Sequence, residues 1–492
     1  MRQGTLIFLT LCWLAACARA PESFDVVLQS GRVIDPETNL DGVRNIGIRG
    51  DTIARISAEP LIGARTIDAR GLVVTPGFID LHQHGQNQDA YRLMALDGVT
   101  TALELEIGVP DIDRFIEARR ERSPIHFGTA ASYLAARVLA WDMPLPLSTV
   151  GPDAGIIPQS GPATDEPATP ERLSRILATL RRQIEGGGLG VGMGLEYSPG
   201  ATRHEVIEVF KLAATLGKPM FVHVRSSGRI EPGSGVEAVT EVIGAAAISG
   251  AALHIVHINS TCMSDSPECL SMIAGARARG LDVTTEAYPY TAAMTFINSA
   301  LFNPGWRERR GLDYRDLELP ESGERLTRDR FEALHAAPEP RLVLIHTNPD
   351  AVVDAIIAAP LVAIASDGLK DHPRGAGTHA RVLARYVRDQ KTITLNDAIR
   401  KMSLLPAQRL EKATPDAKRI GRLQQGAQAD IVVFDPQTVQ DRAGFRAPTE
   451  ASVGVRYLLV AGTLVVNDGR IVEGVTPGRA FVGNSDSQRQ GR

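Results

Sequence analysis

The sequence predicts an α/β protein: a (β/α)8 barrel joined to a small β-sandwich domain that is built from the N- and C-terminal segments. Three observations support this fold. Short segments rich in Val and Ile occur near both ends of the chain, apolar β-rich runs alternate with helical segments between them, and histidines or an aspartate follow several of these runs. The length of 492 residues suits a barrel with an added small domain.

The small domain is predicted over residues 24–70 and 425–485. From residue 24 to about residue 68, short runs of Val and Ile are separated by Gly, Asn and Asp, and no helical period is present. The same pattern returns at residues 429–436 and 454–472. We therefore expect the two ends of the chain to pack together as one β-sandwich.

The barrel is predicted over residues 71–424. After the apolar run at 71–80, further apolar runs alternate with helical segments, and this alternation indicates parallel strands with crossover helices. These runs lie at residues 100–106, 126–132, 189–195, 220–224, 253–258, 281–287 and 362–366. About eight strands favour a closed barrel. The clearest helices are the amphipathic segments at residues 170–185 and 203–216.

Two stretches interrupt this alternation. Residues 140–168 are rich in Pro and Gly, and we expect them to form a loop over the barrel mouth. The stretch from about residue 291 to 340 is too long for a simple βα connection, so we predict an inserted lid or subdomain there. Its aromatic residues Phe296, Phe302 and Trp306 are expected to pack within the insertion rather than to bind a cofactor.

The composition excludes one class of partner. The formal net charge is -4 and 22% of the residues are charged, with no basic bias, so a nucleic-acid groove is not indicated. We expect a small molecule as the partner instead. The sequence leaves the oligomeric state open.

The first 20 residues resemble an export signal. An apolar stretch at residues 6–14 is too short to span a bilayer and is followed by small residues. LAAC at residues 14–17 resembles a bacterial lipobox, which predicts a lipoprotein signal at residues 1–16 and a lipid anchor on Cys17. The alternative is ARA at residues 18–20, a site for ordinary signal peptidase. Both predict an exported, periplasmic protein, and the lipobox would anchor it to the outer membrane.

Two cysteines lie outside this signal, Cys262 and Cys269. An oxidising compartment would allow a disulfide to persist between them. Two free thiols are the alternative, and the sequence leaves the choice open.

A pair of histidines marks the end of the first predicted barrel strand. His82 and His84 follow the apolar run at 71–80. Residues i and i+2 of a strand point to the same face, so both imidazoles can reach one ion. Imidazole suits divalent ions such as zinc. The pair therefore predicts a metal site at the carboxyl ends of the barrel strands, where barrels place their functional groups.

Further candidate ligands end later strands in the same order. His223, His257 and Asp367 each stand at the end of an apolar run. A single strand-end histidine is more often structural, but four such strand ends in barrel order would converge on one place. His254 lies three residues before His257 and therefore faces the opposite side of the strand. Of these two histidines, His257 is the predicted ligand.

These residues, with PGFIDLHQH at residues 76–84 and GVTT at residues 98–101, resemble the amidohydrolase superfamily over nearly all of the chain that follows the signal. DVTTEAYPYTA at residues 282–292, SDG at 366–368 and HPRGAGT at 372–378 are similar to its D-aminoacylase branch, the N-acyl-D-amino-acid deacylases. The resemblance implies a metal-dependent hydrolase barrel that binds one or two divalent ions, and zinc is the ion we expect.

The chain departs from that branch at one metal ligand. The branch has a cysteine after the GVTT strand, whereas this chain has TALELEIG at residues 101–108. Glu104 and Glu106 share a face of that strand, and a carboxylate there could bridge two ions. We predict Glu106 as the bridge, with Glu104 and the mid-barrel Glu196 as alternatives. The predicted metal ligands are therefore His82, His84, Glu106, His223, His257 and Asp367.

The resemblance also implies substrate-binding residues. Arg374 would hold a substrate carboxylate with its planar fork of donors, and Tyr288 would donate a hydrogen bond to the oxygen of the scissile carbonyl. The branch commonly has a lysine two residues after the last histidine ligand, where this chain has Asn259, so we expect that part of the substrate to be bound differently. Arg225 and Tyr197 are expected to line the pocket, with a purely structural role as the alternative.

The implied reaction is hydrolysis of an amide bond in an N-acyl amino acid, expected to be of D configuration, or in a dipeptide with a free carboxylate. A metal-activated water would attack the carbonyl, with Asp367 and Tyr288 as catalytic residues. Asp367 would accept the water proton and return it to the leaving amine. Two alternatives remain open: a dihydroorotase-like enzyme that acts on cyclic amides, and a metal-binding envelope protein without activity.

Overall fold

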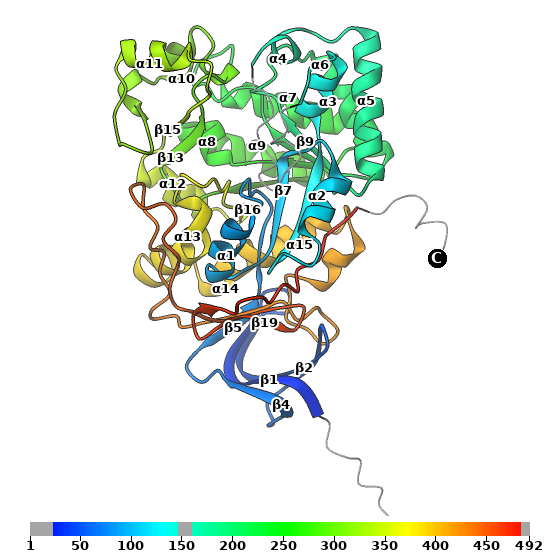
Figure 1. Ribbon diagram of the computed structural model, residues 1–492, viewed down its shortest axis with the longest axis vertical. Helices are drawn as coiled ribbons and strands as arrows, with labels where there is room; N and C mark the ends of the chain where they lie inside the picture. The colour runs from blue at the N-terminus through cyan, green and yellow to red at the C-terminus, as the bar shows by residue number, and fades with distance from the viewer. Residues whose placement is uncertain (1–22, 146–159, 484–492) are drawn as a thin grey trace, which may run out of the picture.

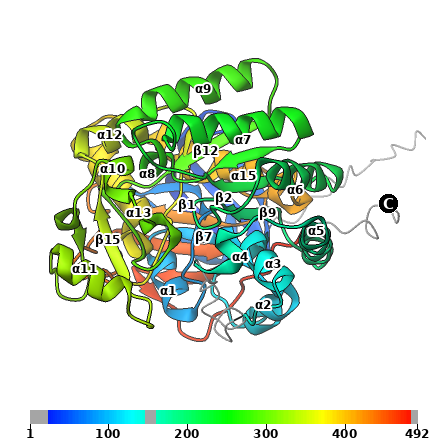
Figure 2. The same ribbon diagram turned by 90° about the horizontal axis from the view of Figure 1, so that it is seen from above.

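The computed structural model describes residues 23–145 and 160–483, and a parallel barrel forms its centre (Figures 1 and 2). Its eight strands lie in the order β16-β12-β11-β10-β9-β8-β7-β6. Between the two end strands, the His84 N–H donates to the Gly368 carbonyl (3.0 Å) and the Gly368 N–H donates to the His82 carbonyl (3.3 Å). These bonds join β16 to β6, and the predicted (β/α)8 barrel is confirmed. The strands are β6 (Phe78–Asp80), β7 (Val99–Val109), β8 (His126–Ser132), β9 (Val191–Gly194), β10 (Met220–His223), β11 (Leu253–Ile255), β12 (Val283–Ala287) and β16 (Val362–Ile364).

Helices connect successive strands and lie around the barrel (Figure 2). In α5, the Thr169 side chain accepts a hydrogen bond from the Arg172 N–H, Pro170 occupies the first turn, and one face is buried. The helix predicted at residues 170–185 is present as predicted, and the one predicted at 203–216 ends one residue earlier. The helices between the strands are α1 (Gln88–Leu96), α2 (Ile112–Arg119), α3 (Tyr133–Ala140), α5 (Pro170–Glu185), α6 (Arg203–Thr215), α7 (Gly235–Ser249), α9 (Ser266–Ala278) and α12 (Asp350–Ala358).

The two ends of the chain build one small sheet domain, at the opposite end of the molecule from the insertion (Figure 1). The sheet branches at β1, which pairs with β2, β4 and β5, and β5 in turn pairs with β17 from the C-terminal segment. Side chains such as Val33, Val74 and Ile431 form its own buried core. The nine strands are β1 (Ser23–Asp35), β2 (Leu40–Arg49), β3 (Thr52–Ser57), β4 (Ile62–Asp68), β5 (Val73–Pro76), β17 (Ile431–Phe434), β18 (Val455–Val460), β19 (Thr463–Asn467) and β20 (Arg470–Ile471).

The limits of this domain differ from those predicted. The sheet continues through β5 to Pro76, beyond the predicted boundary at residue 70, because β5 connects its two halves. At the other end, the chain leaves the sheet and runs along the barrel. The Phe127 N–H donates to the Arg479 carbonyl (3.2 Å) and the Phe481 N–H donates to the Phe127 carbonyl (2.7 Å).

The inserted unit lies between β12 and α12 and has its own sheet and core. The sheet consists of β13 (Ala292–Phe296), β14 (Leu317–Glu318) and β15 (Leu342–His346), with α10 (Trp306–Arg310) and α11 (Arg328–His335) beside it. Because β15 pairs with β13, the insertion extends to residue 346 and not only to 340. Phe302 and Trp306 pack in its core as expected, whereas Phe296 lines a cavity described below.

Some predictions fall wholly or partly outside the described residues. The signal at residues 1–20, with Cys17, lies outside them, as does the central part of the loop predicted at 140–168. Residues after this gap pack against α3: Arg137 Nε donates to the Ala163 carbonyl (2.6 Å). No helix within the described ranges is long and apolar enough to cross a membrane. Cys262 and Cys269 form a disulfide, which answers the question that the sequence left open.

A buried lysine beside β16 makes the stability of the fold depend on pH. Lys401 is almost fully buried, and its ammonium donates hydrogen bonds to the Val362 carbonyl (3.0 Å) and to the Ala359 carbonyl. Burial, with a smaller effect of Arg400, lowers the pKa of Lys401 to about 7. Above this pH the folded protein has released a proton that the unfolded chain retains up to about pH 10.

Because the unfolded chain then binds more protons, the contribution of Lys401 to stability rises with pH from about 7 upward. Relative to a Lys401→Met variant, we expect the wild type to gain at most about 1.4 kcal/mol of unfolding free energy per pH unit above pH 7. Below pH 7 the difference between the two proteins should stay constant. Melting temperatures of both at pH 6, 7, 8 and 9 measure this, and two parallel profiles would contradict it.

Candidate metal centre

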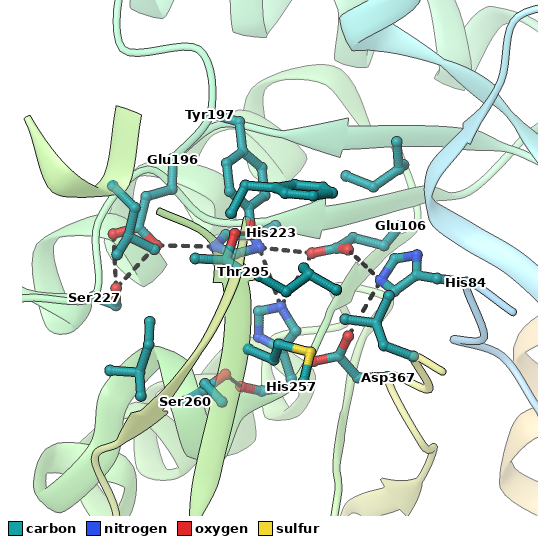
Figure 3. A pocket seen from close by; sticks show the side chains of 18 of the residues that line it. His84, Glu106, Glu196, Tyr197, His223, Ser227, His257, Ser260, Thr295 and Asp367 are labelled. Atoms are coloured by element: carbon teal, nitrogen blue, oxygen red, sulfur yellow. Dashed lines mark hydrogen bonds and ion pairs between the residues drawn. The ribbon is translucent and has the colours of Figure 1, made fainter. Parts of the chain in front are cut away.

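Six polar side chains meet at the carboxyl ends of the barrel strands, and Figure 3 shows most of them around one cavity. They are His82 and His84 after β6, Glu106 in β7, His223 at the end of β10, His257 after β11 and Asp367 after β16. All six are the residues that the sequence predicts as metal ligands. The barrel therefore brings together side chains that lie up to 285 residues apart along the chain.

The first group of ligand atoms comes from four residues. Glu106 Oε2 lies 3.1 Å from His82 Nε2 and 3.2 Å from His84 Nε2. Asp367 Oδ1 lies 3.4 Å from His82 Nε2 and 3.2 Å from His84 Nε2. All four ligand atoms lie within 4.8 Å of one another. Imidazole nitrogens and carboxylate oxygens gathered so closely could hold a divalent ion.

The second group shares Glu106 with the first. Glu106 Oε1 lies 2.6 Å from His223 Nδ1 and 3.1 Å from His257 Nε2. The two nitrogens lie 3.1 Å apart. The two oxygens of one carboxylate thus face two separate groups of nitrogen atoms. This is the geometry expected of a bridging ligand. Among Glu104, Glu106 and Glu196, Glu106 is the residue that has this geometry.

The backbone conformation at two of these residues is unusual. His257 has φ 30° and Asp367 has φ 50°, values in the left-handed region that side-chain-bearing residues rarely adopt. Both residues lie just after a barrel strand, where the chain turns away from the barrel. Such strained positions cluster at functional sites, because the surrounding structure must maintain them.

Three of the histidines also contact a second carboxylate, through the ring nitrogen that points away from the clustered ligand atoms. His82 Nδ1 lies 2.7 Å from Glu286 Oε1, and His84 Nδ1 lies 2.6 Å from Glu104 Oε2. His223 Nε2 lies 2.9 Å from Glu196 Oε2 in the same way. A carboxylate on the outer nitrogen fixes the tautomer and orientation of a histidine and leaves its other nitrogen free for a ligand.

These contacts argue against the two other candidates for the bridging ligand that the sequence left open. Glu104 and Glu196 each hold the outer nitrogen of a histidine, so neither occupies the position between the two groups. The supporting role of Glu286 was missed. Its signal was a carboxylate in a predicted barrel strand, which needs a partner because burying an unpaired charge is costly. Glu286 also contacts His254 Nε2 (3.0 Å), which places His254 away from the ligand groups as expected.

Opposite charges dominate the electrostatics of the site. Burial acts to raise the pKa of Glu106, but His82, His223 and His257 outweigh burial and hold it well below its usual range. Burial acts to lower the pKa of His223, whereas Glu106 and Glu196 raise it to about 9. Despite burial, the pKa values of His82 and His84 are also raised by the neighbouring carboxylates, whereas burial and His223 lower the pKa of His257.

A cavity of about 380 Å³ lies beside this cluster (Figure 3). Tyr197 lines it, as predicted: its ring packs edge-on against His223 at 4.8 Å and its hydroxyl lies 3.3 Å from Thr295 Oγ1. Much of the remaining wall comes from the insertion and is apolar. These apolar lining residues are Ala293, Met294, Phe296, Leu301, Leu342 and Ile345.

The residues predicted to bind the substrate carboxylate and carbonyl lie behind Asp367. Arg374 Nη1 lies 3.0 Å from Asp367 Oδ2, and the Arg374 guanidinium stacks over the Tyr288 ring at 4.6 Å. Asn259 is also buried there, and its Nδ2 donates to the Tyr288 carbonyl (3.2 Å). Tyr288 and Arg374 are almost fully buried. Neither residue is among those that line the cavity.

The prediction for Arg225 needs correction. Its guanidinium forms a two-bond ion pair with Glu241 of α7 (2.8 and 2.7 Å) and does not line the cavity. A residue that the sequence did not single out lies there instead. Arg310, at the end of α10, lines the cavity and lies 2.9 Å from Glu196 Oε1. No local pattern marks Arg310, because its contact depends on how the insertion docks on the barrel.

A parallel barrel with nitrogen and oxygen ligands at the carboxyl ends of its strands is the architecture of metal-dependent barrel enzymes. Known proteins that are similar to this chain define its class more closely. The amidohydrolase family matches residues 163–466. N-acyl-D-glutamate deacylase of Alcaligenes xylosoxydans xylosoxydans is 32% identical, over 90% of this chain and 94% of its own length. D-aminoacylase of the same organism is 30% identical, over 90% and 95%.

A solved structure is similar over almost the whole chain. N-acyl-D-glutamate deacylase from Bordetella bronchiseptica, in complex with zinc and a phosphonate inhibitor that mimics the tetrahedral intermediate, is 27% identical with a TM-score of 0.76. The match covers 94% of this chain and 100% of that chain. The chain belongs to the amidohydrolase family. Its resemblance to the D-aminoacylase branch is therefore confirmed, and the protein is a hydrolase.

The shared position of Glu106 leads to a prediction about metal content. We expect the purified protein to hold close to two divalent ions and the Glu106→Ala variant to hold one or none, because each group loses one of its ligand atoms. Plasma mass spectrometry measures the content. Glu241→Ala, which removes a carboxylate bound to Arg225, is the control and should match the wild type. Equal metal content in the wild type and Glu106→Ala would rule out Glu106 as the bridge.

Proposed function

We propose that this protein hydrolyses the amide bond of an N-acyl-D-amino acid, or of a dipeptide with a free carboxylate, with one or two zinc ions held by the six clustered side chains. The observation that carries this proposal is the Glu106 carboxylate, whose two oxygens face two groups of histidine nitrogens. The deacylase activities of the relatives support the substrate class. The D configuration rests on those relatives alone.

The donor set fits a zinc centre. His82 and His84 each have one nitrogen occupied by a carboxylate, and their other nitrogens lie 3.2 Å apart, facing Glu106 and Asp367. Two imidazole nitrogens and two carboxylates in this arrangement are the ligands that zinc prefers. A bound ion supplies Lewis acidity, which activates water and polarises the amide carbonyl.

Asp367 is the residue we assign to proton transfer. Burial acts to raise its pKa, but Arg374 and the histidines hold it below its ordinary value, so the side chain is an anion that can accept a proton. Its Oδ1 faces the histidines and its Oδ2 faces Arg374. Asp367 would take a proton from the attacking water and return it to the leaving nitrogen.

Two donors of Arg374 support a carboxylate-binding role for this residue. Arg374 is almost fully buried, and its Nε and Nη2 have no hydrogen-bond partner, whereas Nη1 lies 3.0 Å from Asp367 Oδ2. The Tyr288 hydroxyl is also buried without a partner. Buried polar groups are nearly always satisfied, so exceptions beside the clustered ligands are consistent with a role in binding. A substrate carboxylate for Arg374 and a carbonyl oxygen for Tyr288 would satisfy both, once the side chains that separate them from the cavity have moved.

The cavity wall favours an uncharged substrate side chain or acyl group. Six apolar residues of the insertion line it. The positive charge of Arg310 is already balanced by Glu196. Lys370 is the other Lys or Arg among the lining residues, and the apolar residues outnumber these two. A strong preference for N-acyl-D-glutamate would therefore contradict this part of the proposal.

Two other functions have weaker support. A dihydroorotase-like reaction on a cyclic amide fits the fold, but among relatives matched over most of the chain the D-amino-acid deacylases are 32% and 30% identical and a dihydroorotase is 25% identical. A metal-binding protein without activity would have no need of Asp367 paired with Arg374 beside the ligands. Hydrolysis of an acyclic N-acyl amino acid would argue against the cyclic-amide hydrolase. Turnover of any of these substrates would exclude a metal-binding protein without activity.

A paired panel of D and L N-acetyl amino acids tests the proposal. We expect the zinc-loaded protein to hydrolyse the D series, with methionine and leucine derivatives preferred over glutamate. Asp367→Asn should lower kcat by roughly 100- to 10,000-fold, because general acid–base catalysis is lost. Asp371→Asn, four residues away and not part of the cavity lining, is the control. Turnover of the L series alone, or full activity of Asp367→Asn, would refute the assignment.

We also propose that the protein is exported and anchored by a lipid on Cys17. The LAAC pattern at residues 14–17, after an apolar stretch, supports this. We expect the protein purified from membranes to begin at Cys17 and to carry acyl chains, as measured by intact mass, and Cys17→Ser to lose them. A mature chain that begins after ARA at residues 18–20 would favour the soluble periplasmic form.

A further inference from the structure

A chain of three side chains joins the insertion to the candidate metal centre. Arg310 Nη1, from α10 of the insertion, lies 2.9 Å from Glu196 Oε1. The other oxygen of that carboxylate, Glu196 Oε2, lies 2.9 Å from His223 Nε2. His223 in turn directs its Nδ1 at Glu106. Figure 3 shows Glu196 and His223 in this arrangement at one side of the cavity.

All members of this chain are removed from solvent. The side chains of Arg310, Glu196 and His223 are 5%, 10% and 9% exposed. Ser227 completes the group: its hydroxyl donates to Glu196 (2.7 Å) and accepts a hydrogen bond from Arg310. An ion pair in such a low-dielectric setting is screened little by solvent, and removing one partner leaves an uncompensated buried charge.

The direction of these contacts matters for His223. Glu196 accepts the Nε2 proton and so keeps Nδ1, the nitrogen that faces Glu106, available as a ligand. Glu196 can hold this orientation only while its other oxygen is bound. Within the described part of the chain, Arg310 and Ser227 are the groups that bind that oxygen, and Arg310 is the cation.

We propose that Arg310 is a positioning residue for the metal centre, which acts on His223 through Glu196, and that metal binding and docking of the insertion are therefore coupled. This inference rests on the metal site of the proposed function. The same insertion supplies the apolar wall of the cavity. Metal occupancy would thus also order the surface that contacts the substrate. Coupling of this kind is reciprocal: whatever loosens the insertion weakens metal binding by the same factor.

The neighbouring residue offers a matched control. Arg309 lies on the same short helix, but its guanidinium donates to the carbonyls of Pro304 (2.7 Å) and Asn303 (3.2 Å) within the insertion. Arg309→Met therefore removes a charge and two hydrogen bonds from α10 without touching Glu196. Arg310→Met removes the contact to Glu196, and Arg310→Lys keeps the positive charge while losing the planar fork.

The experiment measures zinc affinity by chelator competition, and hydrogen exchange of residues 306–335 with and without zinc. We expect Arg310→Met to bind zinc about tenfold more weakly, as for the loss of an outer-shell partner. Arg310→Lys should recover part of this loss, and Arg309→Met should match the wild type. Zinc should slow exchange in the insertion of the wild type and of Arg309→Met, and it should not do so in Arg310→Met.

Three outcomes would overturn the inference. Zinc affinity of Arg310→Met equal to the wild type would remove Arg310 from the metal centre. Faster exchange in Arg310→Met without any loss of zinc affinity would mean that Arg310 only holds the insertion in place. A wild type that binds no zinc would overturn both this inference and the proposed function, whereas the first two outcomes leave the proposed function intact.

Discussion

The structure depends on one buried carboxylate that must be balanced from several directions. Glu106 lies inside the barrel, where an unpaired charge would cost several kcal/mol. Its partner His82 follows the neighbouring strand β6, whereas His223 and His257 follow β10 and β11 across the barrel, so the charge is fully balanced only when the barrel is closed. The short ladder between β6 and β16, through Gly368, completes that closure.

Residues farther from Glu106 hold the histidines around it in place. Each histidine that faces Glu106 is either oriented by a further carboxylate or, like His257, held at an unusual backbone angle. Outer carboxylates would keep the ligand nitrogens ready in the absence of an ion, so that an ion would replace protons rather than reorganise side chains. Through Glu196 this support reaches the insertion, which also forms the apolar wall of the cavity.

The sequence predicted the barrel, the paired terminal segments and all six clustered residues, because each signal is local: apolar runs, their alternation with helices, and polar residues at strand ends. It predicted Glu106 as the bridging residue but left Glu104 and Glu196 open as alternatives, since a two-residue period places Glu104 and Glu106 on one face. The choice follows from the register of β7, which shifts against β8 after Glu104. Arg225 was expected at the pocket and Arg310 was not singled out, because an ion pair with a distant element decides where a long side chain points.

The glutamate at residue 106 also bears on how many ions the site could hold. A cysteine, which the related branch carries at the end of this strand, offers a single sulfur atom. A carboxylate offers two oxygens, and in this chain they contact separate nitrogen groups, with Oε2 at His82 and Oε1 at His223. If each group held one divalent ion, the Glu106 carboxylate would lie between the two ions and offset part of their positive charge. Glutamate in place of cysteine at this position therefore favours one site in which two ions share a ligand over two separate single-ion sites.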